Sequence, residues 1–168
     1  MKERKDTQDL RRRLADLPSA SPLRRFGAMV YDGLLVIAMM LTTTGLLNLF
    51  APRPLIPEGA EVVSIEQMET ISGPLLTSIL FIQTFLFFAF FWMRYGRTLG
   101  MQAWRLRVIS DDGLPITAMQ SLKRFLAAIP SLGLLGAGYL WFWLDPARLT
   151  WPDRLSGSRI VRVPDDLT

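Results

Sequence analysis

Three long apolar stretches, separated by charged segments, dominate the hydrophobic pattern of this chain: residues 26–51, 71–93 and 125–144. The second stretch contains no charged residue, and its phenylalanines fall on every side of a helix. At about 1.5 Å per residue, such a helix can cross a hydrocarbon core of about 30 Å. A chain of 168 residues is too short to bury a helix of this kind in protein. The pattern therefore predicts an integral membrane protein.

The other two apolar stretches each contain an interruption. Asp32 is the one charged residue of the first stretch, which we expect to form another transmembrane helix. The third stretch contains Pro130 and Gly133, so it either spans the membrane or breaks at residues 130–133 and returns to the side where it began. The expected fold class is an all-α membrane protein with two transmembrane helices and a third membrane-embedded helical segment, spanning or re-entrant.

Two short segments, residues 104–109 and 158–163, flank the third stretch and alternate between apolar and polar residues like strands. Each is bounded by a turn that contains glycine. Short strands are unstable alone and would pair only if they lay on the same side of the membrane. The pattern therefore favours short cytosolic strands, a returning third segment and a cytosolic position for Asp165 and Asp166, while a spanning helix stays open.

The distribution of Lys and Arg predicts the orientation. Residues 1–25 and 94–124 are rich in both, whereas residues 52–70 contain one basic residue, Arg53, and are acidic. Because cytoplasmic loops carry the excess of basic residues, we expect the first two segments to be cytosolic and residues 52–70 to be external. The expected domains are a cytosolic basic tail (1–23), a membrane domain (24–163) and a C-terminal tail (164–168).

Composition narrows the expected chemistry. A formal charge of +4 and a pI near 10.0 would suggest nucleic acid in a soluble protein, but here they indicate basic flanks facing an anionic leaflet. The expected partners are therefore membrane lipids and not nucleic acid. The chain has no Cys and no His, which removes thiol chemistry, the usual metal ligands and the usual proton shuttle. We expect no cofactor, no metal site and no enzymatic activity.

The N-terminal tail contains Leu10, Leu14 and Leu17 at helical spacing among basic residues. This pattern fits a solvated tail or a short helix on the inner leaflet, and both readings stay open. Residues 18–22, with a proline at each end, would then be a hinge into the first transmembrane helix.

Asp32 is the most costly residue of the chain, because a carboxylate in a transmembrane helix costs about 2.5–3.5 kcal/mol. It needs a partner, a proton or a water-filled cavity. One interpretation is that Asp32 holds the helices together by pairing with a basic residue. The other is that it binds a proton or an ion. Arg25 lies two turns earlier on the same helix face.

A second aspartate, Asp153, lies in a turn-rich segment and is followed at once by Arg154. An aspartate in a turn usually bonds to its own backbone. We nevertheless expect Arg25, Asp32 and Asp153 to converge near the cytosolic membrane surface, because Asp32 is too costly to be left unpaired. Arg148 and Arg154 are the other candidate counter-charges.

Together these residues resemble the RDD family of bacterial membrane proteins, named for one arginine and two aspartates. Arg25 and Asp32 match the first two positions, and Asp153 matches the last. The middle signature matches residues 97–100 and 106–108. The motif residues with expected structural roles are Thr98, Gly100, Arg107 and Gly157.

The resemblance covers residues 24–163 approximately and implies a location in the bacterial inner membrane. The family often has a histidine before its last aspartate, where this chain has Pro152, so a proton relay through that position is not available. The family's function is unsettled, and some members are associated with exchange of monovalent cations for protons.

Two hypotheses follow. The first is a small transporter in which Asp32 and Asp153 are candidate ion- or proton-binding residues. Two or three helices without an internal repeat enclose little volume, so a transporter would need a homo-oligomer or another membrane protein. Gly133 and Ala137 form a pair of small residues that would permit close helix contact. The alternative is a non-catalytic accessory or assembly subunit that binds lipid or another membrane protein.

Overall fold

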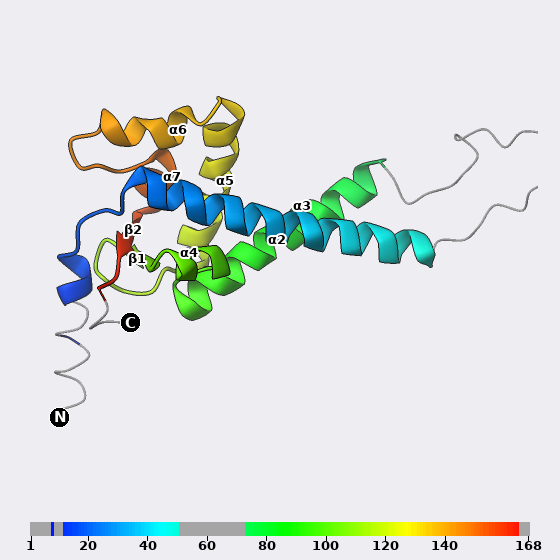
Figure 1. Ribbon diagram of the computed structural model, residues 1–168, viewed down its shortest axis with the longest axis horizontal. Coiled ribbons are helices and arrows are strands. Elements are labelled where there is room, and N and C mark those ends of the chain that lie inside the picture. The colour runs from blue at the N-terminus through cyan, green and yellow to red at the C-terminus, as the bar shows by residue number, and fades with distance from the viewer. Residues whose placement is uncertain (1–7, 9–11, 51–72, 165–168) are drawn as a thin grey trace, which may run out of the picture. The chain divides into compact units, whose positions relative to one another are not determined.

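A computed structural model describes residue 8 and residues 12–50 and 73–164 of the chain. It forms two compact units, Met1–Gly33 with Phe85–Thr168, and Leu34–Thr84. In chain order the elements are α2 (Pro22–Leu49), α3 (Gly73–Tyr95), α4 (Leu99–Ala103), β1 (Leu106–Ser110), α5 (Ala118–Gly133), α6 (Ala137–Leu140), the 3-10 helix η2 (Trp141–Trp143), α7 (Trp151–Ser156) and β2 (Ser158–Arg162) (Figure 1). The candidate residues Arg25, Asp32 and Asp153 all belong to the first unit.

The two predicted transmembrane helices are confirmed. Both α2 and α3 are long and apolar enough to cross a membrane. Pro22 and Pro74 lie in their first turns, where a missing backbone N–H costs nothing. Within the second unit, Gln83 Nε2 donates to the Met39 carbonyl oxygen at 3.5 Å and joins the two helices. The predicted external segment 52–70 lies outside the described residues.

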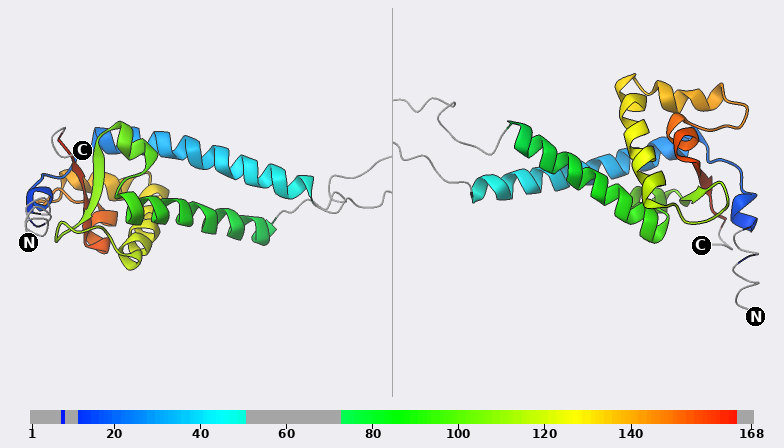
Figure 2. Two further views of the ribbon diagram at one scale, coloured as in Figure 1. Left: turned by 90° about the horizontal axis from the view of Figure 1, so that it is seen from below. Right: turned by 180° about the vertical axis from the view of Figure 1, so that it is seen from behind.

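The third apolar stretch forms two helical parts, Ala118–Gly133 and Ala137–Trp143, bent by 106° relative to each other. Figure 2 shows that α5 and α6 run in different directions. The break that was expected at residues 130–133 is present but lies just after them, because α5 continues through Pro130 to Gly133. The chain reverses at Leu135 and Gly136, whose backbones are left-handed (φ 54° and 83°) and cannot continue the helix. Gly133 and Ala137 therefore lie in different helices and do not form one stripe of small residues.

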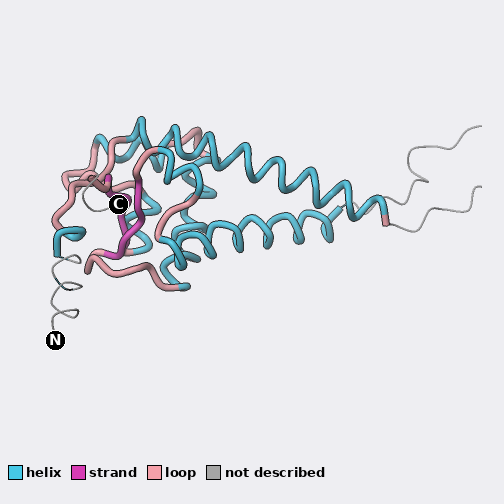
Figure 3. The backbone as a smooth tube through the Cα atoms, turned by 60° about the horizontal axis from the view of Figure 1, so that its bottom comes forward, coloured by secondary structure: helices cyan, strands magenta, loops and turns pink. Residues whose placement is uncertain are grey.

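The two predicted strands pair, as Figure 3 shows. β1 and β2 are antiparallel, with Leu106 opposite Arg162 and Ser110 opposite Ser158. β1 precedes the bent segment and β2 follows it, so both ends of that segment lie at one sheet. A helix that crosses a bilayer once separates its ends by about 30 Å of hydrocarbon. The strand pairing therefore favours the returning segment over a single crossing by α5 and α6.

The N-terminal residues that the structure describes pack against this sheet. Leu14 is buried in a cluster with Ile109, Val161 and Val163. Ser19 forms a bridge with Val161, and the Ala20 N–H donates to the Ile160 carbonyl oxygen at 2.8 Å. Leu14 therefore covers the sheet and faces neither solvent nor lipid, so both interpretations of the N-terminal segment are wrong at this residue. Residues 18–22, which were expected to be a hinge, are held by their hydrogen bonds to β2. Leu10, Asp165 and Asp166 lie outside the described residues.

The main core of the first unit lies where α3, β1 and α5 meet. Its buried members are Ala20, Ala28, Trp92, Met101, Leu106, Val108, Ile116 and Phe125. The Phe85 and Phe125 rings lie 5.3 Å apart, and the Phe88 and Trp92 rings lie 5.2 Å apart. Such offset aromatic contacts add to the free energy gained by burial. This core fixes α5 against α3 and so determines where the polar side chains of α5 point.

Candidate functional site

Helix α7 begins with a capping box that orients Asp153. The Asp153 N–H donates to the Thr150 hydroxyl at 3.4 Å, and Asp153 Oδ2 accepts a hydrogen bond from the Thr150 N–H at 3.1 Å. Gly157 ends the helix in a left-handed conformation (φ 61°), which suits glycine, and β2 follows at once. The interpretation of Asp153 as a capping residue is confirmed. Its side chain is buried, with 1% of the residue exposed.

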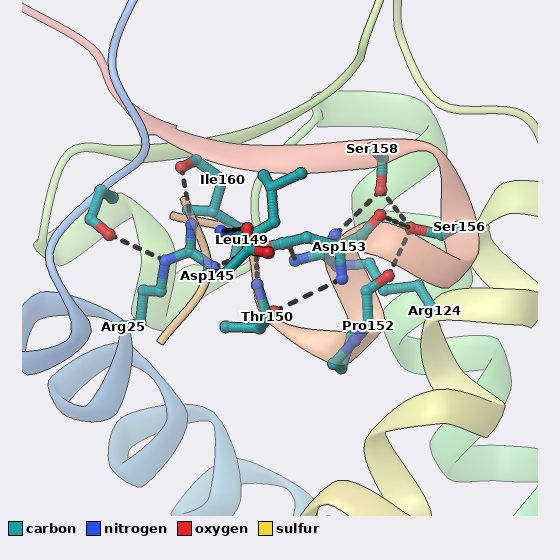
Figure 4. A network of polar contacts seen from close by, with 11 residues as sticks. Arg25, Arg124, Asp145, Leu149, Thr150, Pro152, Asp153, Ser156, Ser158 and Ile160 are labelled. Atoms are coloured by element: carbon teal, nitrogen blue, oxygen red, sulfur yellow. Dashed lines mark hydrogen bonds and ion pairs between the residues drawn. The ribbon is translucent and has the colours of Figure 1, made fainter. Parts of the chain in front are cut away.

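Two buried arginines from different helices bind the Asp153 carboxylate (Figure 4). Arg25 of α2 donates from Nη1 to Oδ2 at 2.5 Å, and Arg124 of α5 donates from Nη2 to Oδ1 at 2.6 Å. Arg25 also donates to two backbone carbonyl oxygens, and Arg124 donates to the Ser158 hydroxyl at 2.9 Å. The Asp153 carboxylate therefore joins α2, α5 and α7, and the two arginines extend this network to β2.

The charges of this cluster keep Asp153 ionised. Burial alone would raise the pKa of Asp153, but attraction to Arg124 and Arg25 outweighs burial and lowers the pKa below its usual value. Each arginine also lies over an aromatic ring, Arg25 over Phe142 at 5.4 Å and Arg124 over Trp92 at 5.7 Å. Because two fixed guanidinium groups occupy both oxygens, this geometry suits a structural ion pair better than a site that exchanges ions.

The two other candidate counter-charges contact other groups than Asp153. Arg154 forms its ion pair with Asp145, and its Nε donates to Asp145 Oδ1 at 2.8 Å. Arg148 lies over the Phe142 ring at 5.9 Å. Consecutive residues of a helix point about 100° apart. Since Asp153 faces the interior, Arg154 is turned outward and cannot bind the same carboxylate.

Asp32 forms a second, separate polar site. It is 4% exposed, and its carboxylate accepts hydrogen bonds from the Thr98 hydroxyl at 2.5 Å and from the Gly100 N–H at 2.8 Å. Thr98 is the N-cap of α4. Among the described residues, the hydrogen-bond partners of Asp32 are uncharged. The expected convergence holds for Arg25 and Asp153 but not for Asp32, because seven residues separate Arg25 from Asp32 by about 10 Å along the helix axis.

The remaining motif residues shape the backbone around these sites. A Cβ at Gly100 would lie 2.8 Å from Asp32 Cγ and closer still to the Ala28 carbonyl oxygen, so only glycine permits this approach of α4 to α2. At the end of α3, Gly96 is left-handed (φ 69°) and lies under the Arg107 side chain. Gly157 is the left-handed residue between α7 and β2. Of these residues, Gly100 lies against Asp32, and Gly157 ends the helix that carries Asp153.

Sequence reasoning treated Arg124 as the boundary of an apolar stretch and missed its role as the second partner of Asp153. A signal was present in the spacing of Ser121, Arg124 and Ser131, which places them on one face of α5, and all three are buried. For the pairing of Thr98 with Asp32 no local signal exists, because 66 residues separate them.

Comparison with known proteins agrees with the family resemblance. The family model described as the RDD family matches residues 19–157, which include both polar sites. No curated protein and no solved structure matches the chain. The match begins in the segment that lies along β2 and ends at the glycine that caps α7.

Proposed function

Because this chain belongs to the RDD family and is an integral membrane protein, we propose that it is a small transporter of monovalent cations or protons that uses Asp32 as its ion-binding group. The proposal places it in the inner membrane of a bacterial cell, with residues 94–124 and the N-terminus cytosolic, on the basis of their Lys and Arg. Two transmembrane helices and a returning segment enclose little volume, so the proposal includes assembly as a homo-oligomer or with another membrane protein. It involves no chemical reaction.

The observation that carries this proposal is the contrast between the two aspartates. Asp153 is neutralised by two arginines, whereas Asp32 is buried in an apolar helix with uncharged partners among the described residues. A buried carboxylate without a counter-charge favours uptake of a proton or a cation. Carboxylate and hydroxyl oxygens, as on Asp32 and Thr98, suit hard cations.

Ion binding at Asp32 would also act on α4. The Thr98 hydroxyl and the Gly100 N–H both donate to this carboxylate. Hydrogen bonds to an ionised acceptor are about twice as strong as those to a neutral one. When Asp32 takes up a proton or shares its oxygens with a cation, the link from α2 to α4 weakens. Binding of a proton or cation at Asp32 could thus alter the position of α4 in the cytosolic segment that follows α3.

The test is cation-driven proton flux in vesicles that contain only this protein. Wild type should carry flux, and Asp32→Asn should reduce it to the level of empty vesicles while the protein stays inserted and folded. Thr98→Val, which removes one donor to the carboxylate, should change the apparent ion affinity. As a matched control, Asp145→Asn removes a carboxylate that pairs with Arg154 and should keep its flux. Normal flux in folded Asp32→Asn would refute the role of Asp32.

A second candidate, a non-catalytic accessory or assembly subunit, is favoured by the hydrogen bonds themselves. Both oxygens of Asp32 already accept a hydrogen bond that links α2 to the N-terminus of α4. In that case wild type carries no flux, and Asp32→Asn lowers thermal stability or assembly. Arg25→Ala should then cause a similar defect, because Arg25 links α2 to α7.

A further inference from the structure

An apolar groove lies between the first two turns of α2 and the returning part of the third segment, within the first unit. Its volume is about 500 Å³, inside the range of about 300–1,000 Å³ that is typical of small-molecule sites. The apolar walls are formed by Leu23, Phe26, Met29, Leu132, Leu135, Leu140 and Trp143. Several of these side chains are more than half exposed, among them Phe26, Leu132 and Leu135. The walls therefore offer apolar surface to a bound molecule.

The same groove has a polar end. Arg25, Tyr139 and Thr150 line it together with the apolar residues. Arg25 and Thr150 are buried, at 3% and 1% exposure. The Arg25 guanidinium is held by its bonds to Ala20, Asp153 and Ile160, so it gives this end charge and not a free donor. Tyr139 is half-buried and offers the most accessible surface of the three.

The charge of this polar end is positive. Beneath it, Arg25 and Arg124 share one carboxylate, that of Asp153, so the buried cluster has one surplus positive charge. Tyr139 lies close enough to interact electrostatically with all three groups. A groove with apolar walls and a positive end is complementary to an amphiphile whose head is an anion.

We propose that this groove binds one phospholipid with an anionic headgroup, its acyl chain along Phe26 and Leu132 and its phosphate toward Tyr139, above the positive cluster of Arg25 and Arg124. The groove lies at the start of the first transmembrane helix, where lipid headgroups are found. A zwitterionic lipid carries its own compensating positive charge and gains less from the surplus charge of the cluster. A second helix has a diameter of about 10 Å and fits a groove of this volume less well than a chain does. The proposal is independent of ion transport.

The test compares binding of phosphatidylglycerol and phosphatidylcholine to the full chain in mild detergent, by native mass spectrometry. Wild type should retain one phosphatidylglycerol per chain with about tenfold preference over phosphatidylcholine, the equivalent of ~1.4 kcal/mol. Leu132→Trp fills the groove and should lower phosphatidylglycerol affinity by about tenfold. Leu126→Trp is the matched control, because Leu126 is also an exposed leucine of α5 but does not line the groove.

Tyr139→Phe keeps the ring and removes one donor, so it should narrow the preference for phosphatidylglycerol without changing the binding of phosphatidylcholine. If Leu132→Trp fails to fold, Leu140→Trp, on the opposite side of the bend, fills the same groove and is judged by the same result. Equal binding of the two lipids by wild type overturns the proposal. The proposal is also overturned if Leu126→Trp loses as much phosphatidylglycerol binding as Leu132→Trp does. A groove variant that changes the oligomeric state while lipid binding stays the same overturns it as well.

Discussion

At the residue scale, the two aspartates of the family motif have surroundings that differ in charge. Asp153 lies between two guanidinium groups that hold it in one position. Asp32 meets a hydroxyl and a backbone N–H, which stabilise a carboxylate but do not neutralise it. Breaking a buried ion pair leaves a charge without compensation, whereas losing a neutral partner does not. Substitutions at Asp32 and at Asp153 should therefore have different effects on the protein.

Asp153→Asn should strongly destabilise the protein. The change leaves Arg25 and Arg124 buried at 3% and 4% exposure without their shared carboxylate. Loss of one partner from a buried pair costs about 3–5 kcal/mol. The measurement is the free energy of unfolding in mixed micelles. Asp145→Asn is the control, since its partner Arg154 is 53% exposed and the loss should be clearly smaller. Equal effects of the two variants would contradict the central role of Asp153.

The pH dependence of the stability of wild type and Asp153→Asn tests whether the carboxylate charge is the cause of this loss. The pKa of Asp153 is lowered in the folded state, so its stabilising contribution is complete above the unfolded pKa of about 3.9. That contribution is lost as the pH falls through the folded pKa. The stability difference between wild type and Asp153→Asn should therefore be constant near neutral pH and shrink below pH of about 4. A difference that stays constant into acid would show that the carboxylate charge is not its source.

At the element scale, the short helix α4 is joined to α2 by contacts that require one glycine. A Cβ at Gly100 would press against the Ala28 carbonyl oxygen and the Asp32 carboxyl group. Forcing a methyl group into such a contact costs about 1–3 kcal/mol. Gly100→Ala should therefore lower the melting temperature. The matched control is Gly133→Ala, because no described atom lies within 4 Å of a Cβ there and alanine favours the helix by up to about 1 kcal/mol. A destabilised Gly133→Ala with an unaffected Gly100→Ala would contradict this contact.

The elements also show what the sequence could predict. Helices α2 and α3 and the strands β1 and β2 follow from apolar length and from alternation, which are local properties. The pairing of the two strands was expected only if they lay on the same side of the membrane. The bend after α5 does not follow in the same way, because Pro130 is tolerated inside the helix and the reversal depends on Leu135, a leucine in a left-handed conformation. The hydrogen-bond partners of Asp32 could not be predicted from the sequence, because they depend on how α4 lies against α2 and not on any spacing along the chain.

At the scale of the whole molecule, the strand pairing predicts which segments share a side of the membrane. β1 lies between α3 and α5, and β2 follows α7, yet their backbones are hydrogen-bonded to each other. Ser19, just before α2, forms a bridge with Val161 of β2. The start of α2, the end of α3 and both ends of the returning segment therefore belong to one side. The positive-inside rule predicts that this side is the cytosol.

Single cysteines test this arrangement without background, because the chain contains none. Ser110 is unsuitable, since it is 7% exposed in β1, so the reporters are Asp112→Cys in the following turn and Arg162→Cys at the end of β2, both exposed. A membrane-impermeant maleimide should label these two from the same side in sealed vesicles. Ser64→Cys, in the predicted external segment, should label from the other side. Labelling of Arg162→Cys from the side opposite to Asp112→Cys would mean that the third segment crosses the membrane. This result would refute both the strand pairing and the returning segment.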